Sequence, residues 1–262
     1  MEVEIRSEPR VGKLAVARLI GRSEGRPRLL AEAPGLAETL RALAKDAELV
    51  TGRAAREAAD QAETEALEVL HPLPGGGVIA IEPTRALTAV DVDLGERKGA
   101  DAKRVTRAAN LAAIALAARL LRLKSLGGIV VLDLVGRGHD AAALLAAARV
   151  AFAPDNPGVA IEPVGRFGTL EMSLPRRTRP LAEILTREDG GLSDRSLAHR
   201  LLRRLEAEAS ADPGAQLVAV GAPGVVAEAS ALAPRLAARI GARFRLRPDS
   251  AGPRHAFDVG RA

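Results

Sequence analysis

Cysteine, tryptophan and tyrosine are absent from this chain of 262 residues. The lack of cysteine excludes a disulfide framework and a thiolate zinc site, so no zinc is expected. The four phenylalanines are too few to form a platform on which successive nucleic-acid bases stack. No apolar run reaches the roughly 18 residues of a membrane span, and the amino terminus lacks the pattern of a secretory signal. We therefore expect a cytoplasmic protein with no membrane partner.

Positive charge is in modest excess. The 38 lysines and arginines outnumber the 33 aspartates and glutamates, which gives a net charge of +5. Arginine supplies most of the positive charge, and the excess favours a polyanionic partner. However, the codon bias of a GC-rich genome also produces an alanine- and arginine-rich composition, whatever the function. The charge by itself therefore leaves the partner open.

The spacing of apolar residues predicts strands and helices in mixed order. After a hairpin within residues 1–30, strands are expected over 47–50, 78–81, 87–92, 127–135, 159–161 and 168–173. Helices are expected over 36–43, 53–70, 102–123 and 139–151, and Asp101 is a candidate cap for the third. A basic, proline-containing passage at 175–180 precedes a small βα unit that is expected from residue 192 onward. This order predicts an α+β (mixed α/β) fold.

Two of these apolar strands each contain an aspartate, Asp91 in the first and Asp133 in the second. A carboxylate among apolar neighbours is costly unless a cation or hydrogen bonds compensate for its burial. A strand–helix–strand connection can return the second strand beside the first and bring both carboxylates to one end of the sheet. Two oxygen ligands with water suit Mg²⁺, with Mn²⁺ as a substitute, and Asp93 is a candidate third ligand. The alternative is that both aspartates only cap strand ends or form turns.

Other residues with chemical potential are few. Arg166 and Phe167 precede a strand and could offer a cation and an aromatic face to a nucleic acid. Packing in the core is nevertheless the expected fate of Phe167. His139 is the one histidine that follows closely after the Asp133 strand. The run Gly75–Gly77 predicts a turn and not a phosphate loop, because no Lys-Ser or Lys-Thr pair follows it.

Three segments, in order, resemble signatures of the ribonuclease E/G family. Residues 76–93 are similar to the family's first catalytic strand pair. Asn110–Ala113 and Arg119–Asp133 are similar to its helix and second catalytic strand, and residues 165–173 to its next signature. The resemblance covers about 65–177 and continues more weakly into the tail.

The family consists of Mg²⁺-dependent endoribonucleases that cut single-stranded RNA, so the resemblance implies Asp91 and Asp133 as catalytic, metal-binding residues. It also implies four regions: an RNase H-like subdomain at 1–74, a DNase I-like catalytic subdomain at 75–180, a linker at 181–191 and a small C-terminal domain at 192–262. The C-terminal domain is a candidate for forming a homodimer. The residues expected to contact RNA are Arg166, Phe167, Arg122, Lys124, Arg176 and Arg177.

The chain also departs from the family pattern. The family normally carries an S1 RNA-binding domain and a 5′-end-sensing region, and the interval from Arg28 to Arg53 leaves no room for either. No cysteine is present for the zinc link that should fall near Thr186–Gly191. Asp93 stands where the family usually has asparagine. Gly136 stands where an acidic residue often follows the second catalytic aspartate, and no arginine aligns near Gly158.

The sequence therefore predicts a metal-dependent endoribonuclease that hydrolyses phosphodiester bonds of single-stranded RNA in RNA processing or decay. The missing accessory parts predict weak affinity for long RNA and little preference for a 5′-monophosphate. The alternative is a catalytically impaired relative that acts as an RNA- or protein-binding module.

Overall fold

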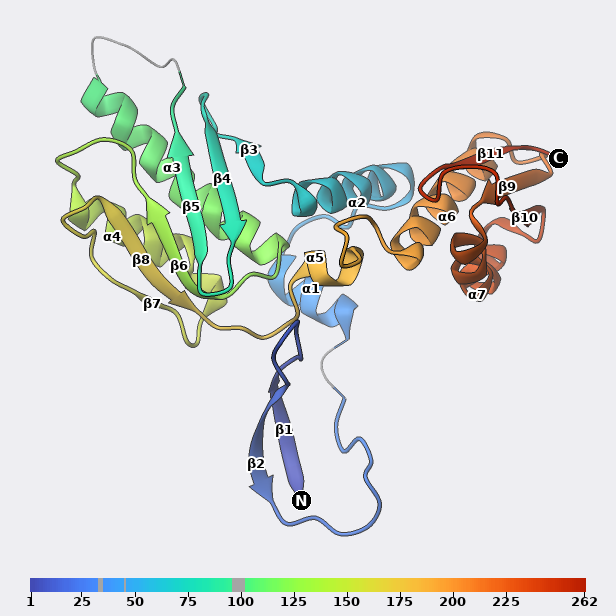
Figure 1. Ribbon diagram of the computed structural model, residues 1–262, viewed down its shortest axis with the longest axis horizontal. Coiled ribbons are helices and arrows are strands. Elements are labelled where there is room, and N and C mark those ends of the chain that lie inside the picture. Colours follow the sequence, from blue (N-terminus) through green and yellow to red (C-terminus); the bar gives the residue numbers. More distant parts are fainter. Residues whose placement is uncertain (33–34, 45, 96–101) are drawn as a thin grey trace. The chain divides into compact units, whose positions relative to one another are not determined.

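Helix α3 (Ala102–Leu123) connects two neighbouring strands, β5 (Thr88–Asp93) and β6 (Gly128–Asp133), which pair in parallel (Figure 1). The computed structural model describes residues 1–32, 35–44, 46–95 and 102–262. Asp101, the expected cap of α3, lies outside these residues. The chain divides into a first unit, Met1–Leu49 with Glu63–Leu181, and a second unit, Val50–Ala62 with Ala182–Ala262. Helix α2 (Gly52–Leu67) contributes residues to both.

The first unit is built on a six-stranded sheet in the order β3-β4-β5-β6-β8-β7. Apart from the β5–β6 pair, the pairings described in this sheet are antiparallel. A parallel pair requires a crossover connection, and α3 supplies it. The remaining strands of the sheet are β3 (Leu70–Pro72), β4 (Val78–Pro83), β7 (Ala160–Ile161) and β8 (Thr169–Leu174).

One face of this sheet is buried and the other is open. Alternate residues of the central strands are buried against α3 and α4 (Ala141–Ala151), with Val90 and Leu132 at most 1% exposed. Alanines at 109, 113, 117 and 118 are also buried, so α3 presents small side chains to the core. Burying each larger side chain contributes about 1.5–3 kcal/mol. Because strand side chains alternate, the same packing directs Asp91 and Asp133 to the open face.

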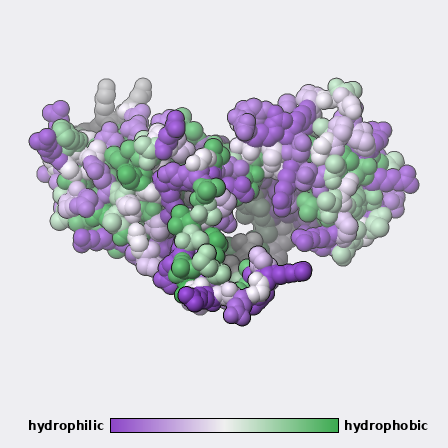
Figure 2. Space-filling view, turned by 60° about the horizontal axis from the view of Figure 1, so that its bottom comes forward, coloured by the Kyte–Doolittle hydropathy of each residue, from purple (hydrophilic) through white to green (hydrophobic). Residues whose placement is uncertain are grey.

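The amino-terminal hairpin pairs β1 (Glu2–Ser7) with β2 (Val16–Gly21) and exposes apolar side chains. Figure 2 brings the hairpin end of the molecule forward and shows apolar residues among strongly polar ones. Glu8 joins the hairpin to the rest of the first unit: its N–H donates to the Arg177 carbonyl at 3.1 Å, and its carboxylate accepts from the Arg179 N–H at 2.9 Å. Helix α1 (Leu36–Ala44) follows.

The strand expected at Ala47–Val50 is not formed, so that prediction was wrong. A strand needs a neighbouring edge, and no described strand pairs with this segment. The second helix ends earlier than expected, at Leu67, because Leu70–Pro72 pairs with β4 as β3. A short 3-10 helix, η1 (Ala153–Asp155), follows α4.

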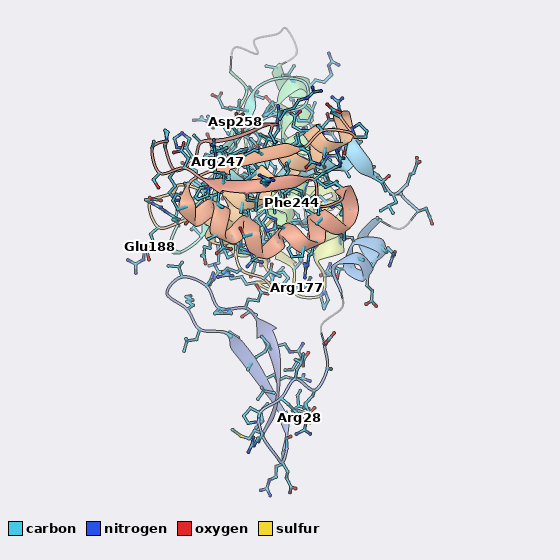
Figure 3. The ribbon with its side chains drawn as sticks, turned by 90° about the vertical axis from the view of Figure 1, so that its right-hand side faces the viewer. Arg28, Arg177, Glu188, Phe244, Arg247 and Asp258 are labelled. Atoms are coloured by element: carbon cyan, nitrogen blue, oxygen red, sulfur yellow. The ribbon has the colours of Figure 1, made fainter. Side chains whose placement is uncertain are left out.

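The second unit contains the expected βα arrangement. Its sheet has the order β10-β9-β11, built from β9 (Leu217–Gly221), β10 (Phe244–Pro248) and β11 (Phe257–Arg261). Helices α6 (Asp194–Ala211) and α7 (Pro223–Ile240) cover one face, where Leu217 and Ala219 are buried. Arg247 and Asp258, labelled in Figure 3, lie on the two edge strands, each opposite Val220.

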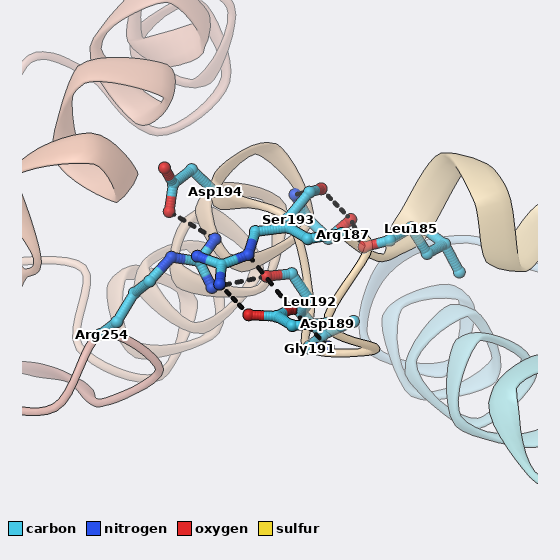
Figure 4. A network of polar contacts seen from close by, with 9 residues as sticks. Leu185, Arg187, Asp189, Gly191, Leu192, Ser193, Asp194 and Arg254 are labelled. Atoms are coloured by element: carbon cyan, nitrogen blue, oxygen red, sulfur yellow. Dashed lines mark hydrogen bonds and ion pairs between the residues drawn. The ribbon is translucent and has the colours of Figure 1, made fainter.

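Part of the expected linker at 181–191 is ordered structure. Helix α5 (Leu181–Leu185) is followed by a turn closed by a bridge between Thr186 and Leu192. Figure 4 shows Arg187 paired with Asp189 inside this turn, and the Arg187 guanidinium lowers the pKa of the Asp189 carboxyl. Arg254 donates to the Leu192 carbonyl at 2.7 Å. The segment where the family resemblance places a zinc link is therefore closed by hydrogen bonds and an ion pair.

The described helices include none that combines the length and the apolar character of a membrane span.

His71 is a buried titratable group in the first unit. It lies on β3, is 2% exposed, and its Nε2 atom has no hydrogen-bond partner among the described residues. Burial lowers the pKa of His71, and the nearby Lys124 cation lowers it further. Burial also lowers the pKa of Lys124. Protonating His71 in the folded protein is therefore unfavourable.

We expect acidification from about pH 7 to pH 5.5 to destabilise the first unit. The folded pKa of His71 lies below its ordinary value of 6.5, so the unfolded chain binds the proton more readily. Stability should therefore rise with pH between the lowered pKa and 6.5, and His71→Gln should flatten that rise. Urea unfolding at several pH values measures the slope. His255→Gln, at an exposed position in the second unit, is the control, and an unchanged slope in His71→Gln would contradict the prediction.

Candidate active site

Asp91, two residues before the end of β5, and Asp133, the last residue of β6, are direct register partners. Both side chains are exposed on the open face of the sheet. Neighbouring strands lie about 4.8 Å apart, so two carboxylates in register on one face are within reach of a single ion. The structure thus brings together the two residues that the sequence identified as the site.

The strands on either side complete a row across the open face. Ala80 on β4 lies opposite Asp91, and Thr169 on β8 lies opposite Asp133. The Thr169 hydroxyl donates to the Glu171 carboxylate at 3.3 Å. Glu171 lies opposite Val131, one pleat away from the aspartate pair. Among the described residues, no three His, Cys, Asp or Glu side chains gather to hold a metal ion.

Asp93 lies on the same exposed face of β5, two positions after Asp91. It lies opposite Val78, and its carboxylate accepts a hydrogen bond from the Gly95 N–H at 2.8 Å. Gly77, at a φ of +82°, packs so tightly here that a Cβ would come within 2.3 Å of the Asp93 carbonyl oxygen. The glycine turn therefore fixes the backbone at the end of β5, and the Asp93 side chain closes a local turn.

A tight turn before β8 presents Arg166 and Phe167. The Gly168 N–H donates to the Gly165 carbonyl at 3.0 Å, and the Gly168 carbonyl accepts from the Leu134 N–H at 3.2 Å. Because Leu134 follows Asp133, this second bond ties the turn to the carboxyl end of β6. Phe167 is 79% exposed, and the Arg166 guanidinium carbon lies 4.7 Å from its ring centroid. Core packing of Phe167 was thus a wrong expectation, since the ring lies at the tip of an exposed turn.

Lys124 and Arg122, both expected to contact RNA, are used within the structure. Lys124 is 6% exposed, and its ammonium donates to the carbonyls of Glu65, Ala66 and Glu68 at the carboxyl end of α2. Arg122 pairs with Asp155 at 2.6 Å and also donates to the Ala151 carbonyl. A buried cation that already satisfies three carbonyls is not available to a phosphate, so the structure replaces the expected role of Lys124 with a structural one.

Arg176 and Arg177 also bind backbone carbonyls. The Arg176 Nε donates to the Gly127 carbonyl at 2.7 Å, and burial lowers the pKa of Arg176. The Arg177 guanidinium, labelled in Figure 3, donates to the carbonyls of Asp155 and Pro157. Arg176 therefore lies at the start of β6, which begins at Gly128. Asp133 lies five residues further along this strand, about 17 Å away at the rise of a strand. Of the six residues expected to contact RNA, Arg166 and Phe167 lie on a turn that is bonded to the end of β6 carrying Asp133. Arg176 is bonded at the opposite end of the same strand.

A family model described as the ribonuclease E/G family matches residues 31–177, more than half of the chain. The chain belongs to the ribonuclease E/G family. It is 37% identical over 147 residues to ribonuclease E of Haemophilus influenzae, and that match covers 52% of the chain and 16% of the relative. Ribonuclease E of Escherichia coli is 35% identical, with 52% and 14% covered, and that of Synechocystis is 31% identical, with 49% and 20% covered. The chain thus matches between 14% and 20% of the length of these curated relatives.

Family membership, the α+β fold and the paired aspartates agree with the sequence analysis, but three contributing residues were missed. Thr169 and Glu171 share the open face, and their alternation with buried Leu170 and Met172 is the signal that could have found them. Asn110 on α3 contacts the backbone beyond β6. The feature of the sequence that could have identified Asn110 is a polar residue among the apolar positions of a helix. His139 also lies close by: its Nε2 has no hydrogen-bond partner among the described residues, and it would lie 3.2 Å from a Cβ at Gly168.

Gly136, where the ribonuclease E/G family often has an acidic residue, is closed to a side chain. Its φ is +86°, and a Cβ there would come within 2.7 Å of Thr106 Cγ2 on α3. Gly138 has a similar φ of +67° but open space around it. Glycine in place of the family's acidic residue at position 136 therefore allows Thr106 on α3 to approach the backbone closely.

We expect Gly136→Asp to lower the free energy of unfolding by about 1 kcal/mol or more beyond the loss caused by Gly138→Asp. Both variants incur the cost of a left-handed backbone, but only the first also displaces Thr106. Urea unfolding of the two variants beside the wild type provides the comparison. Equal losses would show that the contact with Thr106 carries no cost.

Proposed function

We propose that this chain is a metal-dependent endoribonuclease that hydrolyses phosphodiester bonds of single-stranded RNA. The observation that carries the proposal is the register pairing of Asp91 with Asp133 on an open sheet face, in a member of the ribonuclease E/G family. The matched relatives are named ribonuclease E, and the chain spans a small part of their length. The activity of the whole protein is therefore our inference.

The donor set fits a hard divalent cation. Asp91 and Asp133 offer carboxylate oxygens side by side, and their exposure leaves room for the several waters that Mg²⁺ retains. When bound, Mg²⁺ or Mn²⁺ would supply an activated water and would stabilise charge on a phosphodiester. The two aspartates would hold the ion, and Thr169, opposite Asp133, offers a hydroxyl beside it.

The turn of Arg166 and Phe167 supports binding of an unpaired strand. The Arg166 guanidinium already covers one face of the Phe167 ring, and the ring is largely exposed. An unpaired base can stack on such a ring, whereas a base inside a duplex is stacked on its neighbours. The bond between Leu134 and Gly168 holds this turn to the strand end that carries Asp133.

The alternative function is an RNA- or protein-binding module with impaired catalysis. The glycine at position 136 favours it, because a carboxylate side chain there would have to displace the Thr106 side chain of α3. Gly158, near which the family carries a groove arginine, has a φ of +106° and faces Pro175. RNA binding without cleavage, in the presence of Mg²⁺ or Mn²⁺, would establish this alternative.

We expect Asp91→Asn and Asp133→Asn each to reduce cleavage by about a thousandfold or more, since the ion's stabilisation of the transition state is worth several kcal/mol. Hydrolysis of a fluorogenic unstructured RNA in Mg²⁺ measures the rate. Glu82→Gln, on the same sheet face but opposite Ala89, is the matched control and should cleave normally. Asp93→Asn should have a smaller effect, because its carboxylate accepts from Gly95. Equal inactivity of wild type and both variants on several RNAs would sink the enzyme proposal.

We expect Phe167→Leu to weaken binding of single-stranded RNA by about 1–3 kcal/mol, or roughly 5- to 150-fold, because it removes the stacking ring. Phe167→Tyr retains the ring and should bind as the wild type does. Fluorescence anisotropy with a short unpaired RNA gives the Kd. A duplex of the same length is the second arm, and an equal loss of affinity for the duplex would contradict the stacking role.

A further inference from the structure

Asn110 makes two reciprocal hydrogen bonds to one backbone residue. Its Nδ2 donates to the Val135 carbonyl at 3.0 Å, and its Oδ1 accepts from the Val135 N–H at 3.0 Å. Asn110 is 1% exposed and lies on the face of α3 that packs against the sheet. The side chain therefore binds both polar groups of Val135 from the core side.

A buried asparagine in a helix lowers stability unless its amide is fully hydrogen-bonded. The other buried residues of α3 are alanine, isoleucine and leucine. An asparagine in a helix interior lowers helix propensity, and a buried amide left unpaired costs about 1–3 kcal/mol. Here Val135 supplies an acceptor and a donor, so the amide forms a specific link between α3 and the chain beyond β6.

That link lies two residues after Asp133. The backbone between them is held from a second side, because the Leu134 N–H donates to the Gly168 carbonyl at 3.2 Å. Beyond Val135 the chain enters Gly136 and Gly138, both with left-handed φ. The contact with Val135 therefore fixes the strand end before a glycine-rich segment begins.

The bare backbone at Gly136 belongs to the same arrangement. A Cβ there would lie 2.7 Å from Thr106 Cγ2, and Thr106 precedes Asn110 by one turn of α3. The glycine allows the helix to approach closely, and that approach puts the Asn110 amide within bonding distance of Val135. Helix α3 thus contacts the segment after Asp133 at two successive turns.

We propose that Asn110 is a positioning residue for the metal site: it holds the carboxyl end of β6 so that Asp133 stays opposite Asp91. This inference rests on the proposed function, because it gives the link a role in metal binding. A group that hydrogen-bonds a ligating side chain typically contributes 10- to 100-fold in metal affinity, and Asn110 acts on the backbone beside the ligand, so we expect the lower end of that range. Loss of the Asn110 amide should therefore weaken binding of the ion without removing a ligand.

The test uses Mn²⁺ as the probe and measures its Kd by isothermal titration calorimetry on the full chain. Asn110→Leu removes both hydrogen bonds at similar side-chain volume, and we expect it to raise the Kd about tenfold or more. Ala113→Gly is the matched control: it weakens the same helix at a fully buried position and leaves Asn110 in place. Asn110→Ser replaces Asn110→Leu if the latter does not fold.

A second measurement reports the link itself. Hydrogen exchange of the Val135 amide, followed by NMR without metal, should be slow in the wild type and in Ala113→Gly. It should be faster in Asn110→Leu. A general loss of stability would speed exchange across α3 and β6 in both variants, whereas a positioning role predicts a change confined to the segment after Asp133.

The outcomes separate the two proposals. If the wild type binds Mn²⁺ and Asp133→Asn does not, but Asn110→Leu binds as tightly as the wild type, the positioning role is overturned and the proposed function stands. An equal rise in Kd for Ala113→Gly also overturns it, since the effect would then be one of helix stability. If the wild type binds no Mn²⁺, the proposed metal site fails, and the role of Asn110 fails with it.

Discussion

The parallel, in-register pairing of β5 with β6 is the constraint on which the first unit depends. Parallel neighbours cannot be joined by a tight turn, so the chain must cross the sheet, and α3 makes that crossing. The helix buries its alanines against the sheet while it returns the chain to the starting edge. Asp91 and Asp133 are consequently held opposite each other by backbone pairing and core packing, with no direct contact between them required.

The same packing determines what the open face can do. Because alternate side chains of each strand enter the core, the residues between them stay in solvent. Asp91 and Asp133 therefore need no buried partner to offset desolvation. The cost of burying a carboxylate, by which the sequence drew attention to Asp91 and Asp133, does not arise here, since these strands are buried on one face only.

Several of the basic residues stabilise the fold by binding backbone carbonyls, although the net positive charge suggested an anionic partner. Lys124, Arg176 and Arg177 donate to backbone carbonyls at helix ends and turns, where the backbone has unpaired acceptors. Their number and sign could be counted in the sequence, but whether each cation is satisfied internally depends on carbonyls up to 59 positions away. Arg166 differs because its turn lies beyond the sheet, and its guanidinium stacks on an exposed ring.

The family, the mixed α+β character and most helices and strands were predictable from the sequence, because they follow from local periodicity and ordered signatures. The sequence also identified Asp91 and Asp133 as a pair. Three-dimensional packing was needed to show that Leu70–Pro72 joins the sheet and that Ala47–Val50 does not. It was also needed to show that Phe167 is exposed while Lys124 is buried. It alone revealed the link from Asn110 to Val135. Strand pairing, burial and side-chain partners join residues far apart in the chain, and no local pattern records which of them will meet.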